Sequence, residues 1–138
     1  MAERGTIDSK TAIDRLIGTA DFLRIAYERL VADWQPDAPP LTVIFADLGR
    51  SLCRHVNALP EATARELCLV IEDLMAHGDE NVKNAVATGM LEAILSESSS
   101  NRFNLEAIAR WFGPHTTAYC LAWDAFTGVP STWHTPNQ

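Results

Sequence analysis

The sequence HGDENV, residues 77–82, marks the end of one helix and the start of the next. Gly78 ends the first helix, because glycine is the usual residue just past a helix C-terminus. Asp79 follows as an N-cap, where its carboxylate accepts from a free amide and offsets the positive helix end. Glu80 adds negative charge to the same turn. This stretch therefore predicts a helix–helix junction.

An apolar stripe with helical spacing follows the junction. Its members recur every three or four residues, as one face of a helix requires: Val82, Val86, Gly89, Met90, Ala93 and Ile94. We expect Gly89 to let a neighbouring helix approach closely, despite a propensity cost of about 1 kcal/mol. The serine-rich segment 96–101 is expected to be a loop.

Two further helices are expected towards the C-terminus. A short one carries an apolar stripe over residues 105–112 and ends at Gly113, and Pro114 suits the first position of the next. Gly128 stops that last helix. Its aromatic side chains lie at helical spacing: Tyr119, Trp123 and Phe126. We expect them in the core, and a ligand pocket is the alternative.

The residues before the junction predict four helices. A first helix runs from a Ser9 cap to Leu16, and a second, with Phe22, Ile25, Ala26 and Leu30 on one face, runs to about Trp34. The proline-rich segment 35–40 breaks the chain. The third helix covers residues 41–59, with a short strand at 42–44 as the competitor, and the fourth starts at Pro60.

These patterns predict an all-α protein with a single domain. We expect a bundle of about six or seven helices over residues 1–128, for which stacked antiparallel helix pairs are one arrangement, and an uncharged tail over 129–138 that contains Trp133. A chain of 138 residues is long enough to bury a sizeable core. The apolar stripes leave open whether it is a monomer or a homodimer.

Composition narrows the classes of partner. The net charge is −7, from 11 basic and 18 acidic residues, and the basic residues are scattered, so nucleic acid is not an expected ligand. No apolar run approaches the roughly 18 residues that span a bilayer, so we expect no membrane association. Three cysteines at irregular spacing favour reduced thiols in the cytoplasm. The acidity provides solubility or steers a basic partner.

The sequence offers no convincing catalytic group. Cys53 and His55 are two residues apart and would point to different faces of a helix, so a nucleophile–base pair is not favoured. The four histidines lack the short spacing of metal ligands, and no glycine-rich phosphate loop occurs. We therefore expect no enzyme activity, no metal and no cofactor. His77 suits the negative end of its helix, and His115 has no assigned role.

The densest acidic region flanks the helix junction. It consists of Glu72, Asp73, Asp79 and Glu80. Three interpretations are open: a solvated helix face, a patch that binds a partner, or a pair of carboxylates for acid/base catalysis. Catalysis would need a cleft that keeps one carboxylate protonated and another ionised, and no pattern indicates such a cleft.

Residues 67–94 and 112–128 resemble a family of small helical bacterial proteins found beside polymorphic or secreted toxins and taken to be immunity proteins. The resemblance rests on five stretches: IEDL at 71–74, GDENVKN at 78–84, GMLE at 89–92, FGP at 112–114 and WDAF at 123–126. It covers about the C-terminal two-thirds of the chain and fades in the N-terminal third.

The resemblance implies an all-α, non-enzymatic domain that binds and neutralises a cognate toxin with a basic contact surface. Within the pattern, Asn81, Gly89 and Trp123 are expected to hold the fold. The expected contact residues are the acidic ones at the junction: Glu72, Asp73, Asp79 and Glu80. The alternative is a non-catalytic helical adaptor, and a more distant one is a small hydrolase that uses Cys53 or an acidic pair.

Overall fold

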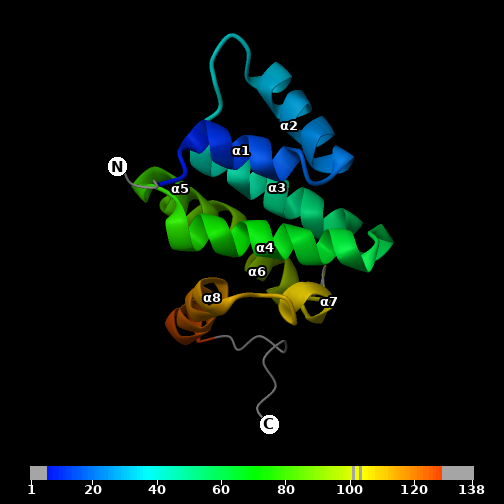
Figure 1. Cartoon of the computed structure of the whole chain (residues 1–138), viewed down its shortest axis with the longest axis vertical. Helices are drawn as coiled ribbons and strands as arrows, with labels where there is room; N and C mark the ends of the chain where they lie inside the picture. The colour runs from blue at the N-terminus through cyan, green and yellow to red at the C-terminus, as the bar shows by residue number, and fades with distance from the viewer. Residues whose placement is uncertain (1–5, 101, 103, 129–138) are drawn as a thin grey trace.

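The computed structural model describes residues 6–100, 102 and 104–128, and over these residues the chain is all-helical (Figure 1). The elements are α1 (Ser9–Ile17), α2 (Asp21–Trp34), α3 (Leu41–His55), the 3-10 turn η1 (Val56–Ala58), α4 (Glu61–His77), α5 (Glu80–Ala85), η2 (Val86–Leu91), α6 (Glu92–Ser99), α7 (Glu106–Ala109) and α8 (Pro114–Thr127). α5, η2 and α6 follow one another without a break and form one continuous helix, so the described residues form seven helices. The predicted all-α, single-domain bundle of about six or seven helices is confirmed. The predicted tail, residues 129–138, lies outside the described residues.

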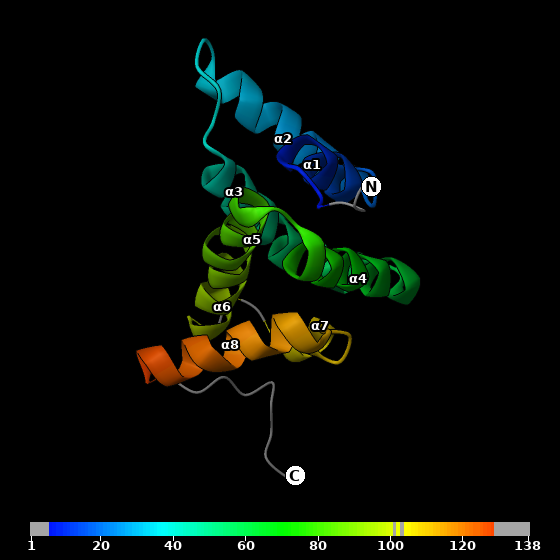
Figure 2. The same cartoon turned by 60° about the vertical axis from the view of Figure 1, so that its left-hand side comes forward.

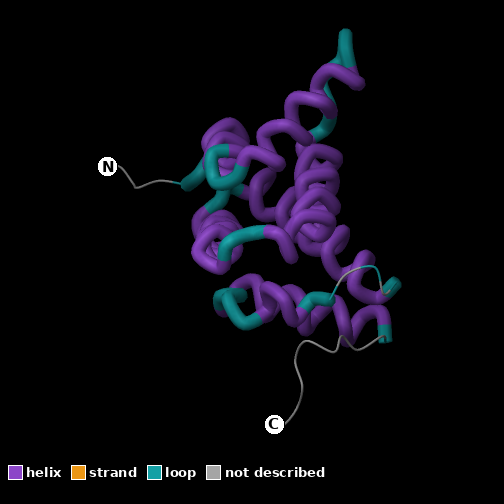
Figure 3. The backbone as a smooth tube through the Cα atoms, turned by 90° about the vertical axis from the view of Figure 1, so that its right-hand side faces the viewer, coloured by secondary structure: helices purple, strands orange, loops and turns teal. Residues whose placement is uncertain are grey.

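The helices are arranged around the long helix α5–η2–α6. In Figure 2, α1 and α2 lie at one end, α3 and α4 occupy the middle, and α7 and α8 cross below α4 at the other end. The tube in Figure 3 shows from another side that the helices nearest the C-terminus, α7 and α8, form a layer below the rest. The α5–η2–α6 helix packs along α3, while α8 packs on α4.

The closest helix crossing joins α3 to η2, which is π-helical over its whole length. A Cβ on Gly89 would lie 2.6 Å from the carbonyl oxygen of Thr42, and a Cβ on Gly49 would lie 2.8 Å from that of Met90. Each helix therefore meets the other's backbone at a glycine, and Phe45 is fully buried beside this contact. The predicted close approach at Gly89 is confirmed.

Several helix ends follow from residues at the ends themselves. Asp79 accepts a hydrogen bond from the Val82 amide at 2.8 Å, as predicted for an N-cap, and Gly78 ends α4. Gly128 ends α8 in the left-handed conformation, with φ 74°. The first helix differs from the prediction, because Asp8 and not Ser9 supplies the cap, accepting from the Thr11 amide at 2.8 Å.

Three expectations about the helices are wrong. Residues 96–99 continue α6 as a helix, because the buried Ile94 and Leu95 hold the preceding turn in the core. The third helix ends at His55 and continues only as the 3-10 turn. Ile25 is 48% exposed, since Leu23 is the residue that α2 buries.

Candidate functional site

The backbone of the acidic segment between α4 and α5 is hydrogen-bonded to Ile7, a residue far away in the sequence. The Ile7 amide donates to the His77 carbonyl and the Asp79 amide donates to the Ile7 carbonyl, both at 2.9 Å, which makes an isolated parallel bridge between Ile7 and Gly78. The bridge sets the N-terminus of α1 beside that of α5. We call Asp8, Asp73, Asp79 and Glu80 the acidic junction.

Two members of the acidic junction cap helices. The Asp8 and Asp79 carboxylates each accept from an amide in the first turn of α1 or α5. Hydrogen bonds from the Thr11 backbone and side chain lower the pKa of Asp8, because they stabilise its ionised form. Asp8 is not among the contact residues predicted from the sequence. Its position before a helix is typical of a cap, but only the Ile7 bridge brings it to Asp79.

Asp73 is partly neutralised within the chain. Arg15 on α1 donates to the Asp73 carboxylate and forms an ion pair with it, and His77 lies 3.9 Å from its other oxygen. The side chains of Arg15 and Asp73 are 37% and 39% exposed, so water still reaches both. This carboxylate ties α4 to α1 while remaining on the surface.

Glu80 is the unpartnered member of the acidic junction. It is the first residue of α5, its side chain is exposed, and within the described part of the chain it takes part in no hydrogen bond or ion pair. A carboxylate at this position interacts favourably with the positive end of the helix and still offers both oxygens to a partner.

Glu72 occupies a different position from the other predicted contact residues. Its carboxylate accepts from the amides of His115 and Thr116, at 3.1 and 2.9 Å, and from the Thr116 hydroxyl at 3.0 Å. The Nδ1–H of His115 donates to it at 2.6 Å. Glu72 on α4 therefore caps the N-terminus of α8, and its side chain is only 17% exposed. This contact also gives a role to His115, for which the sequence pattern indicates none.

Gly113 makes this cap sterically feasible. A Cβ on Gly113 would collide with Cγ of Glu72 and lie 2.5 Å from its Cδ, so only glycine leaves room for the carboxylate. Burial alone would raise the pKa of Glu72, but the hydrogen bonds from Thr116 and His115 outweigh it and lower that pKa. The Glu72 cap thus holds an ionised carboxylate against a helix end, and it connects the IEDL and FGP stretches of the sequence.

The aromatic residues of α8 do not all lie in the core. The hydroxyl of Tyr119 donates to Glu92 on α6 at 2.5 Å, and Trp123 is half-buried. Phe126, however, is 84% exposed, so its predicted place in the core is wrong. The buried side of α8 instead carries Thr116, Cys120 and Asp124.

The three cysteine thiols are all buried and form no disulfide bond. Burial raises the pKa of Cys53, Cys68 and Cys120 to about 12 in each case, so they stay protonated at neutral pH. Cys68 lies 3.7 Å from the Ile108 carbonyl. His55 is held by stacking on Phe22, at 4.5 Å between ring centroids, and by the Ser51 carbonyl. The Cys53 and His55 side chains are thus held by different neighbours.

A small pocket of about 180 Å³ lies between α2 and α3, and it is lined by Ala26, Arg29, Leu30, Asp33, Asp47 and Arg54. Its two arginines and two aspartates balance, and it is smaller than the roughly 300 Å³ of ordinary ligand pockets. Among the described residues, no group of three or more His, Cys, Asp or Glu side chains could hold a metal ion.

No described helix combines the length and the apolar character that crossing a bilayer requires.

One comparison with known proteins gives a match. No curated protein and no solved structure matches the chain. A family described as "Domain of unknown function (DUF7674)" matches residues 13–128, from within α1 to the glycine that ends α8. Since this match spans most of the chain, the protein belongs to the DUF7674 family.

Proposed function

We propose that this protein is an immunity protein, which binds a cognate toxin of the same cell in the cytoplasm and neutralises it without catalysis. The proposal rests on the resemblance described above and on the excess of acidic over basic residues. The partner surface would be basic, as in the active-site cleft of an enzyme that binds a polyanion.

The observation that carries the proposal is the exposed carboxylate of Glu80 at the acidic junction, which has no partner among the residues that the structure describes. Asp8, Asp73 and Asp79 lie on the segments around it, where each also stabilises a helix end or an ion pair. The backbone at the junction is fixed by the Ile7 bridge and two capped helices. A negative surface on a rigid support suits rapid capture of a basic partner, because little ordering is needed on binding.

Glu72 is not part of the proposed contact surface. Its carboxylate is used to cap α8 and is mostly buried. The structure therefore supports reducing the four sequence candidates to Asp73, Asp79 and Glu80, with Asp8 added. Glu80 is the residue whose replacement disturbs the fold least.

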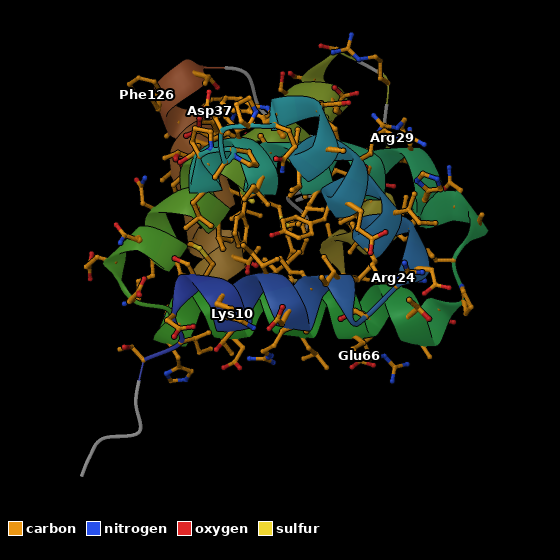
Figure 4. All side chains as sticks on the ribbon, turned by 90° about the horizontal axis from the view of Figure 1, so that it is seen from above. Lys10, Arg24, Arg29, Asp37, Glu66 and Phe126 are labelled. Carbon is orange, nitrogen blue, oxygen red and sulfur yellow. The ribbon has the colours of Figure 1, made fainter. Side chains whose placement is uncertain are left out.

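The test is co-expression with the product of the neighbouring open reading frame, scored by growth rescue and by co-purification. Glu80→Lys is compared with Asp37→Lys, a change of equal charge at an exposed residue in the loop between α2 and α3 (Figure 4). If Glu80 makes a local contact, Glu80→Lys weakens binding by about tenfold or more, while Asp37→Lys has little effect.

Three outcomes contradict the proposal in different ways. Equal effects of the two variants would mean that only total charge matters and that the acidic junction is not the contact surface. Co-purification without growth rescue would support the adaptor instead. Absence of both rescue and co-purification for the unmodified chain would overturn the immunity function for that pair of genes.

A further inference from the structure

The outer face of α8 is apolar and exposed. The side that faces the bundle carries the buried Thr116, Cys120 and Asp124, and the half-buried Tyr119 and Trp123 pack against the core beside them. The opposite side carries what we call the α8 outer stripe: Ala118, Leu121, Ala122, Ala125 and Phe126, all exposed. The exposed side of an amphipathic surface helix is normally polar, so an apolar stripe there is unusual.

The spacing of the α8 outer stripe suits packing against another helix. Its members recur at i, i+3, i+4, i+7 and i+8, the pattern by which one helix face meets a neighbour. Leu121 is 44% exposed and Phe126 is 84% exposed, so two large side chains project from a surface that is otherwise alanine. Figure 4 shows Phe126 at the edge of the molecule. The α8 outer stripe thus combines projections with flat positions that could receive them.

We propose that the α8 outer stripe is the interface of a homodimer, in which two copies of α8 pack antiparallel about a two-fold axis at Ala122. Ala122 lies midway between Ala118 and Phe126. An axis there sets Phe126 of each copy over Ala118 of the other, so that a large side chain faces a small one at both ends. Such self-complementarity is what an isologous interface requires.

Charge favours a second copy over a basic partner. The chain carries a net charge of −7, so two copies repel each other wherever their acidic surfaces meet. The α8 outer stripe contains no charged residue, so this face can be buried against its own copy without bringing like charges into contact. The same lack of charge gives a basic partner nothing to pair with.

The dimer should be weak. A helix of 14 residues is about 21 Å long, and a pair of such helices buries less than the roughly 1,200 Å² of a standard stable interface. We therefore expect reversible association at micromolar or higher concentration. In Figure 1 α8 lies below α4, on the side away from α1 and the start of α5. The proposed dimer uses none of the residues of the acidic junction, so it does not depend on the proposed function.

Sedimentation velocity of the full chain over a range of concentrations tests the proposal. The unmodified chain should show a monomer–dimer equilibrium. Ala122→Glu brings two like charges together at the axis and should weaken association by about tenfold or more. Leu69→Glu is the matched control, because Leu69 is 59% exposed on α4 and should leave association unchanged. Circular dichroism verifies that both variants remain folded.

Cysteine cross-linking tests the register separately. Under mild oxidation Ala122→Cys should form a disulfide-linked dimer, since the three native thiols are buried. Ala118→Cys should not, because an antiparallel pair separates the two copies of residue 118 along the axis by about 12 Å. Cross-linking of both variants would overturn the antiparallel arrangement, because in a parallel pair each residue faces its own copy, and cross-linking of Ala118→Cys alone would overturn the axis at Ala122.

Three results would overturn the dimer itself. The first is a chain that stays monomeric up to millimolar concentration, and the second is a dimer that Ala122→Glu leaves intact. The third is association only after truncation at Gly128, which would mean that the chain's own C-terminal residues, and not a second copy, cover the α8 outer stripe.

Discussion

Two helix contacts hold this protein together by different means. The crossing of α3 with η2 is apolar and close, with a glycine of each helix set against the backbone of the other. The contact of α4 with α8 depends on the Glu72 cap, in which one carboxylate accepts from two backbone amides and two side chains. Both contacts need a glycine, but for different neighbours.

The comparison separates steric fit from charge. The α3–η2 crossing is fixed by volume, since backbone atoms cannot move aside for an added methyl group. The Glu72 cap is fixed by ionisation, because only a carboxylate accepts strongly from all four donors at once. The stability of the α3–η2 crossing should therefore depend on side-chain size and not on pH. The stability of the Glu72 cap should depend on pH and on the presence of the Glu72 carboxylate.

The largest effect is expected from breaking the α3–η2 crossing. Gly89→Val would place side-chain atoms against the Thr42 carbonyl and Phe45, and we expect a loss of about 3 kcal/mol or more in the free energy of unfolding. Urea denaturation measures this loss. The control is Thr88→Ala, one residue away on the exposed side of the same turn, which should change stability by less than about 0.5 kcal/mol.

A small effect of Gly89→Val would mean that α3 and η2 can move apart with little loss in the free energy of unfolding. It would also place the main core elsewhere than at this crossing.

The next effect is expected from removing the Glu72 cap. Glu72→Ala leaves the amides of His115 and Thr116 without their acceptor, and we expect a loss of about 2 kcal/mol. Gly113→Ala should act through the same contact, because the new Cβ displaces the Glu72 side chain. Urea denaturation of both variants, with hydrogen exchange at residues 115 and 116, measures the loss.

The double variant distinguishes a shared contact from two separate ones. If Gly113 is needed only to admit Glu72, Gly113→Ala should have little further effect in the Glu72→Ala background. Additive losses would show that Gly113 has another role, such as the entry angle of α8. Glu66→Ala, an exposed residue on α4 in Figure 4, is the control.

The α3–η2 crossing can be predicted from the sequence better than the Glu72 cap. Gly78, Asp79 and Gly128 act on their own helix ends, so local patterns identify them. The close approach at Gly89 is also predictable, because a glycine inside an apolar helical stripe usually marks the point where a neighbouring backbone comes close.

The Glu72 cap depends on residues 43 and 44 positions apart, and no local pattern reveals its partner. One signal was available, since Gly113 precedes α8 without offering a side-chain cap. A helix start of this kind must find its acceptor elsewhere in the fold.

The acidic candidates show the same limit. An acidic residue in the sequence looks equally available whether it caps a helix, pairs with an arginine or faces solvent. Only the tertiary contacts separate Glu72 and Asp73 from Glu80. For Phe126 the helical spacing was correct, but spacing alone does not say which face of α8 meets the bundle.

A smaller effect is expected from titrating the Glu72 cap. The pKa of Glu72 is lowered in the folded state below its ordinary 4.5, so its ionised form stabilises the fold. That contribution is complete above about pH 4.5 and is lost as the pH falls through the lowered pKa. Thermal unfolding between pH 7 and pH 3 should show it, as extra acid sensitivity that Glu72→Gln reduces and Glu66→Gln does not.

The same acid sensitivity in Glu72→Gln and the unmodified chain would assign it to other carboxylates. The contrast with the crossing would then weaken, because the Glu72 cap would be held by geometry more than by charge. Gly89→Ala gives the reference for a purely steric contact, since its loss of stability should not vary with pH.

The smallest effect is expected at the ion pair of Arg15 with Asp73, which tests whether every polar contact behaves like the Glu72 cap. Both side chains are more than a third exposed, so water and salt screen their attraction. Asp73→Asn should therefore cost less than about 1 kcal/mol, and 0.5 M salt should remove most of that difference. A loss as large as that of Glu72→Ala would show that α1 is held by charge as firmly as α8, and stabilisation by polar contacts would then extend through both ends of the molecule.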